Sequence, residues 1–238
     1  NTTPKAYRKA IKEGVLAWNE AFEAAGFIDA IEVKTQPDDA SWDAGDIRYN
    51  VLRWTSSPNP PFGGYGPSFT NPRTGQILGA DIMLENVYVS NRVRYSRLFD
   101  VAEGAAYAQA PEDDDISDDV VDGELGKAQC AYGAELRQHI SFAATSMIAT
   151  GRGAEVNRLV EEGLKELALH EVGHTLGLSH NMRSSQLRSP DEVHDPDVTQ
   201  GILIGSVMDY APTNLAPKGV EQGDFYTTRP GPYDVWAI

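Results

Sequence analysis

The stretch of sequence that decides the fold is a run of eleven residues with three histidines, one glutamate and two glycines: His170-Glu171-Val172-Gly173-His174-Thr175-Leu176-Gly177-Leu178-Ser179-His180. His170 and His174 are four residues apart, so on a helix their rings project from one face at neighbouring heights. Two neutral imidazoles at this spacing can bind one Zn²⁺ ion. Gly177 permits a left-handed turn that ends the helix and brings His180 back as a third ligand.

Three protein ligands indicate a catalytic zinc site rather than a structural one, because the fourth position stays open to water. Glu171 lies beside the histidine face, within reach of that open position, and is not expected to be a ligand itself. We expect the two other histidines of interest, His139 and His194, to be inert residues of the core and of a surface loop.

The helix that carries the motif is predicted to run from about residue 154 to residue 176. Positions four or three residues apart form one stripe, which begins with apolar residues and ends with two imidazoles: Val156, Val160, Gly163, Leu167, His170 and His174. A stripe of this period places one face of a helix against the core. The metal ligands are therefore expected at the end of a core-facing helix.

Two further helices are predicted. In the first, Thr3 can cap the N-terminus, Pro4 suits the first helical position and Gly26 stops the helix. Its apolar stripe consists of Ile11, Val15, Trp18, Phe22 and Ala25. The second helix is predicted over residues 130–150, with a stripe of Leu136, Ile140, Ala143 and Met147.

Strands are predicted where apolar and polar residues alternate, over residues 31–35, 47–51 and 77–84. Residues 56–67 are rich in proline and glycine and are predicted to form a loop, and residues 71–75 a turn. No repeat or low-complexity linker divides the chain, so we expect one domain with inserted loops.

The composition excludes several function classes. The chain has 238 residues and a formal net charge of −15, which argues against non-specific binding to nucleic acid or to anionic lipid. No apolar run is long enough to span a membrane. Cys130 is the single cysteine, so neither an internal disulfide nor a zinc site of several thiolates can form. No signal segment precedes the first helix, so we expect either a cytosolic protein or a processed or excised piece.

Residues 111–124 contain eight acidic side chains and no basic one. A solvated surface loop is the simplest interpretation, because blocks of like charge usually face water. Calcium binding is the alternative, although the ligand pattern of an EF-hand loop does not fit here.

The eleven-residue motif resembles the signature of the metzincins, a clan of zinc metalloproteases, and the clan's second signature, the Met-turn, matches Ser206-Val207-Met208-Asp209-Tyr210. The resemblance implies that Met208 lies beneath the zinc site as an apolar base. It also implies that Tyr210 corresponds to the tyrosine that approaches zinc in the astacin and serralysin branches. Asn181, directly after the third histidine, does not match those branches, so no subfamily is assigned.

Segments outside the motif also resemble a group of bacterial zinc-dependent metalloproteases: residues 5–25, 44–49 and 74–82, which together with residues 155–215 cover well over half of the chain. The resemblance implies an α+β fold of the zincin type, with a twisted mixed β-sheet, an active-site helix and a smaller C-terminal subdomain. We expect an N-terminal subdomain of residues 1–180 and a C-terminal one of residues 181–238. Members of the group are usually longer, so this chain is expected to be an excised catalytic domain. A secreted, periplasmic or cell-envelope location is expected.

The expected function is zinc-dependent hydrolysis of peptide bonds, with zinc on His170, His174 and His180 and with Glu171 as general base. Tyr210 is the expected helper at the oxyanion, and one catalytic zinc is the expected cofactor, with calcium possible. The expected partner is a protein or peptide substrate that extends along a sheet edge. By resemblance this edge is residues 65–69, and residues 211–217 wall the primed-side pocket. Two alternatives stay open: a catalytically silent zinc-containing binding module, and a zinc hydrolase of a non-peptide amide.

Overall fold

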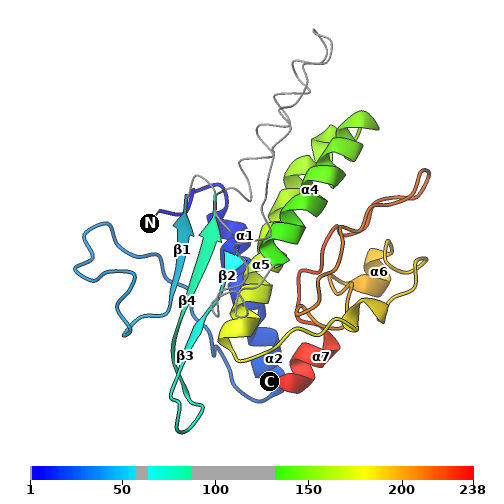
Figure 1. The fold of residues 1–238 in the computed structure, drawn as a ribbon. Helices are drawn as coiled ribbons and strands as arrows, with labels where there is room; N and C mark the ends of the chain where they lie inside the picture. The colour runs from blue at the N-terminus through cyan, green and yellow to red at the C-terminus, as the bar shows by residue number, and fades with distance from the viewer. Residues whose placement is uncertain (1, 57–63, 87–131) are drawn as a thin grey trace, which may run out of the picture.

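The computed structural model describes residues 2–56, 64–86 and 132–238, which form an α+β fold with helices packed on one side of a small mixed sheet (Figure 1). In chain order the elements are α1 (Arg8–Ala17), α2 (Asn19–Ala24), β1 (Val51–Thr55), β2 (Gly64–Tyr65), β3 (Ser68–Thr70), β4 (Ile77–Glu85), α4 (Tyr132–Ala149), the 3₁₀ turn η3 (Gly153–Glu155), α5 (Val156–Thr175), the 3₁₀ turn η4 (Ser184–Gln186), α6 (Pro196–Thr199) and α7 (Pro232–Ala237).

The sheet is built around β4, the longest strand. β1 pairs with β4 in parallel, from Val51 opposite Asp81 to Thr55 opposite Glu85. β2 and β3 pair with β4 in the antiparallel sense. The order β1-β4-β2 places β2 at the opposite end of the described sheet from β1. The predicted mixed sheet is therefore present.

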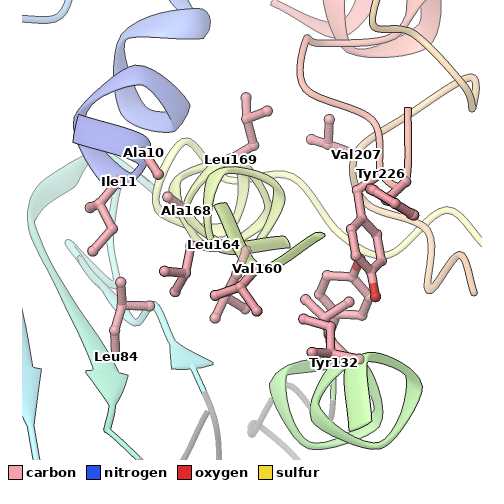
Figure 2. Close-up of a cluster of buried hydrophobic side chains, with 14 of the residues drawn as sticks. Ala10, Ile11, Leu84, Tyr132, Val160, Leu164, Ala168, Leu169, Val207 and Tyr226 are labelled. Carbon is pink, nitrogen blue, oxygen red and sulfur yellow. The ribbon is translucent and has the colours of Figure 1, made fainter. Parts of the chain in front are cut away.

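Helix α5 lies at the centre of the core and is surrounded by side chains from the rest of the fold (Figure 2). The labelled neighbours come from α1, β4, α4 and the C-terminal part of the chain: Ala10, Ile11, Leu84, Tyr132, Val207 and Tyr226. A helix buried around most of its circumference is held rigidly by packing. The residues at its C-terminal end are thus carried by an element that the core holds in place.

The first helix differs from its prediction at its start and in its middle. It begins at Arg8 rather than at Pro4, whose carbonyl accepts a hydrogen bond from the Tyr7 amide in a preceding turn. Trp18 separates α1 from α2, although its backbone stays near helical values. The side chain of Trp18 is fully buried. Gly26 has φ +93° and ends this helical region, as predicted.

Two of the three predicted strands are wrong. Residues 31–35 are irregular, because the Asn19 side chain binds the backbone of Ile31 through two hydrogen bonds of 2.8 and 2.9 Å and ties it to α2. Residues 47–50 are not a strand either. There the Asp46 side chain accepts a hydrogen bond from the Arg48 amide, which stabilises a turn, and β1 begins only at Val51.

The third strand prediction, residues 77–84, is confirmed as β4, and the turn at residues 71–75 is confirmed as well. The predicted loop over residues 56–67 contains the short strand β2. Residues 57–63 and the acidic segment 111–124 lie outside the described residues, so the calcium hypothesis is not addressed by the structure.

The two later helices agree closely with their predictions. Residues 130–150 contain α4, while residues 130 and 131 lie outside the described part of the chain. All four residues of its predicted apolar stripe are buried: Leu136, Ile140, Ala143 and Met147. Residues 154–176 contain α5, preceded by η3. Among the helices of the described segments, none has the length and apolar character that a membrane crossing requires.

Trp18→Phe should destabilise the fold by about 2–3 kcal/mol, because it opens a cavity and removes a buried hydrogen bond. The Trp18 indole N–H donates to the Leu169 carbonyl of α5 at 2.9 Å. Urea unfolding measures the effect. Trp236→Phe is the matched control, since Trp236 is 78% exposed and the same replacement should change stability by less than about 0.5 kcal/mol. Equal effects at the two positions would contradict the structural role of Trp18.

Candidate metal centre and active site

The first two histidines lie near the C-terminal end of helix α5, where the helix leaves the core. His170 is fully buried and His174 is half-buried, so the burial of α5 decreases along the last turn. The Trp18 indole holds the carbonyl of Leu169, the residue directly before His170. The helix position that carries the first histidine is thereby anchored to the N-terminal helices.

A tight turn returns the chain toward α5 after Thr175. Gly177 adopts φ +94°, a left-handed conformation that glycine reaches without steric cost. The Leu178 amide donates to the Gly173 carbonyl at 3.0 Å, and this bond closes the helix. The turn brings the Nε2 atoms of His174 and His180 to 3.0 Å from each other.

The three histidines form a donor set that fits Zn²⁺. Their candidate ligand atoms lie within 4.8 Å of one another. Nδ1 of His170 lies 2.7 Å from the Val207 carbonyl, and Nδ1 of His174 lies 3.0 Å from the Leu178 carbonyl. Because a carbonyl can only accept, each Nδ1 carries the proton and each Nε2 keeps its lone pair for a metal.

Burial keeps the imidazoles neutral. It lowers the pKa of His170 well below the usual value, and the neighbouring His174 adds to this effect. Burial also lowers the pKa values of His174 and His180. Neutral imidazole is the form that binds a metal ion, so the electrostatics of the site agree with its geometry.

The Met-turn is held by the buried carboxylate of Asp234 in α7. This carboxylate accepts hydrogen bonds from the Ser206 hydroxyl at 2.6 Å and from the amides of Val207 and Gly231, both at 2.8 Å. The carbonyl of Val207 is the group that accepts from His170 Nδ1. Asp234 therefore positions the backbone that orients the first histidine.

Met208 and Tyr210 complete this side of the site. Met208 is fully buried and its side chain contacts Gly173 of α5, one residue before the second histidine. The Tyr210 hydroxyl lies 3.1 Å from Nε2 of His180. The turn thus places an apolar side chain against the motif helix and a phenol at the third histidine.

Glu171 is enclosed between α5 and the edge of the sheet. Its side chain is fully buried, and no group in the described ranges makes a hydrogen bond of ordinary geometry to either carboxylate oxygen. A Cβ at Gly64 would come within 2.6 Å of Oε1, and a Cβ at Gly66 within 3.1 Å of Oε2. Burial raises the pKa of Glu171 to about 8, while the Gly66 amide acts in the opposite direction.

The predicted substrate edge, residues 65–69, falls on β2, β3 and the residues between them. Both strands pair with β4. The predicted pocket wall, residues 211–217, is irregular and is anchored by Asn214, whose amide donates to the carbonyls of Val193 and Asp224. His139 and His194 are not part of the histidine cluster.

Sequence reasoning missed several residues that shape the site. Asp234 follows a Gly-Pro pair, which is typical of a helix start, but its partners at the Met-turn are 27 and 28 residues away. The composition predicts that Gly64 and Gly66 lie in a loop, but it does not indicate their contact with Glu171. Tyr132, whose ring centroid lies 4.4 Å from that of His170, had no local signal.

Asp234→Ala should destabilise the fold by about 3 kcal/mol, because it leaves two buried amides and a hydroxyl without their acceptor. It should also weaken zinc binding about 10–100-fold, since the Val207 carbonyl loses its support. Thermal unfolding of the metal-free protein and competition with a chelator measure the two effects separately. Asp191→Ala, at an exposed position, should change neither. Unchanged zinc affinity in folded Asp234→Ala would contradict the positioning role.

Comparison with known proteins agrees with this geometry. Residues 153–238 match the model of a family described as Met-zincin. No curated protein and no solved structure matches the chain. The matched region contains α5, the three converging histidines, the Met-turn and Asp234. The match over residues 153–238 agrees with the resemblance to the metzincins that the histidine motif and the Met-turn indicate.

Proposed function

We propose that the protein is a zinc-dependent endopeptidase. The observation that carries this proposal is the position of Glu171, a fully buried carboxyl directly after the first of three converging histidines. Zn²⁺ held by His170, His174 and His180 would polarise a water molecule and the substrate carbonyl.

In this proposal Glu171 moves the proton. It accepts the proton that water loses when the water oxygen attacks the carbonyl carbon. As the C–N bond breaks, Glu171 delivers this proton to the leaving amine, so peptide and water become a carboxylic acid and an amine. Burial raises the pKa of Glu171 to about 8 in the metal-free protein, and the positive charge of bound Zn²⁺ would lower it, which favours the ionised form that accepts the proton.

Two further residues have proposed roles. Tyr210 donates a hydrogen bond to the substrate oxygen as that oxygen becomes negative, and its hydroxyl already lies at His180. Met208 supplies the apolar base of the site, which is consistent with its complete burial against Gly173.

The substrate is proposed to lie extended along residues 65–69, where main-chain hydrogen bonds would hold it. The contact of Gly64 and Gly66 with Glu171 supports this position, because a chain along this edge passes beside the base. Residues 211–217 are proposed to wall the primed side.

A larger organisation is proposed on the basis of the resemblance. It consists of subdomains of residues 1–180 and 181–238. The proposed location is secreted, periplasmic or cell-envelope, and the proposed partners are peptides or proteins rather than nucleic acid.

The enclosed carboxyl also bears on the alternatives. A buried ionisable group without good hydrogen bonds destabilises a fold, and a silent binding module has no use for it. Hydrolysis of a non-peptide amide would use the same groups. A peptide library separates the three functions, because only a peptidase cleaves it.

Glu171→Gln should lower kcat about 10²–10⁴-fold on a library of denatured-protein peptides, because glutamine cannot accept the proton. Zinc content, measured by elemental analysis, should stay at one ion per chain. The matched control is Glu161→Gln, an exposed position on the same helix, which should keep full activity. If the zinc-loaded wild type cleaves no peptide, the endopeptidase proposal fails. If Glu171→Gln stays active, Glu171 is not the base.

His180→Ala should weaken zinc binding by more than about 100-fold, because one of three ligands is lost. The variant should still fold, since α5 is held by the apolar core and not by the metal. For the same reason, chelation of the wild type should lower the melting temperature while unfolding stays cooperative. His194→Ala, outside the cluster, is the control and should bind zinc normally. Complete loss of cooperative melting after chelation would contradict a core that folds without metal.

A further inference from the structure

We propose that Tyr132 is a positioning residue that fixes the ring of Tyr210 at the metal centre. The inference rests on the proposed function, because it explains how the Tyr210 ring is held in position for its proposed role. Tyr132 is the first residue of α4, and neither the motif nor the Met-turn includes it.

The rings of Tyr132, Tyr210 and His170 form a compact triangle. The centroid of the Tyr132 ring lies 4.4 Å from that of His170 and 4.9 Å from that of Tyr210. Tyr210 and His170 are farther apart, at 5.6 Å. The Tyr132 and Tyr210 rings are stacked, with an interplanar angle of 22°. Tyr132 therefore contacts the first histidine and the phenol at the third histidine at once.

Tyr132 is itself held firmly. It is fully buried, and its hydroxyl faces the carboxyl of Glu166, which lies four residues before His170 on α5. Tyr132 and Tyr226 belong to the same buried cluster (Figure 2), and the Tyr226 hydroxyl is hydrogen-bonded to Thr213. A ring fixed by α4, α5 and the C-terminal segment can restrain a more exposed neighbour.

Tyr210 is that more exposed neighbour. Its residue is half-buried, and its hydroxyl contacts His180, which is on the exposed side of the cluster. The backbone of Tyr210 is fixed by the Asp209 carboxylate, which accepts from the Tyr210 amide at 2.8 Å. The side-chain torsions of Tyr210 are limited by the stack against Tyr132, together with the contact of its ring with that of His180, whose centroid lies 4.7 Å away.

The test compares a replacement that keeps the stack with replacements that remove it. Tyr132→Phe keeps the ring, whereas Tyr132→Leu and Tyr132→Met fill the space without an aromatic face. A 3-fluorotyrosine placed at position 210 reports the environment of that ring by ¹⁹F NMR, in the zinc-loaded and in the metal-free protein. We expect one resonance with the wild-type shift in Tyr132→Phe. In whichever non-aromatic variant folds, we expect a shift toward that of exposed fluorotyrosine. An unchanged resonance there overturns the proposal.

Kinetics provide a second, independent readout. Tyr132→Leu should lower kcat about tenfold with KM within twofold, and Tyr132→Phe should stay within twofold of wild type in both. In a Tyr210→Phe background, Tyr132→Leu should have no further effect beyond twofold, because the hydroxyl that it positions is gone. A tenfold loss in both backgrounds would mean that Tyr132 acts only as a core residue and would overturn the proposal.

The two readouts also separate this inference from the proposed function. If the wild type cleaves no peptide but the ¹⁹F resonance moves as expected, the peptidase proposal fails and the positioning of Tyr210 stands. If the wild type is an active peptidase and neither the resonance nor kcat responds to loss of the ring at position 132, the positioning role is wrong.

Discussion

The orientation of the first histidine depends on one buried carboxylate, that of Asp234. It binds the amide of Val207, and the carbonyl of Val207 accepts from His170 Nδ1. Each group in this sequence of hydrogen bonds is out of contact with water. A buried network of this kind stabilises one geometry when all its members are paired and is costly when one is missing. The ligand is thus fixed from outside its own helix.

The opposite side of the same histidine is fixed by apolar packing. Helix α5 lies between α1, α4 and the sheet, and Trp18 binds the carbonyl that precedes His170. The centre therefore forms where two independently supported pieces meet, a core helix and a turn held by a C-terminal carboxylate. This arrangement explains how Glu166 and Glu171 can be fully buried at the site, since the large core offsets the cost of enclosing them.

The sequence predicts the local parts of the site and not the long-range ones. The spacing of His170 and His174, and the left-handed turn at Gly177, are local geometry that follows from helix periodicity and glycine conformation. Asp234 and Tyr132 reach the site only through tertiary packing, which no local pattern encodes. The strand errors have the same origin. Residues 31–35 alternate like a strand, but the backbone of Ile31 is hydrogen-bonded to the Asn19 side chain and not to a neighbouring strand.

The enclosed position of Glu171 links the base to the sheet edge. Gly64 and Gly66 lie very close to Glu171. A side chain at position 64 would clash with the Glu171 carboxylate, and one at position 66 would clash with the Glu171 backbone carbonyl. The backbone of residues 64–66 therefore affects the pKa of this carboxyl in two ways, because it helps to exclude water, which raises the pKa, and it supplies the Gly66 amide, which lowers it. In the proposed mechanism that same backbone begins the edge along which the substrate lies. A shift of this edge relative to α5 would consequently alter both the alignment of the substrate and the proton affinity of the base, so the two properties cannot vary independently in this fold.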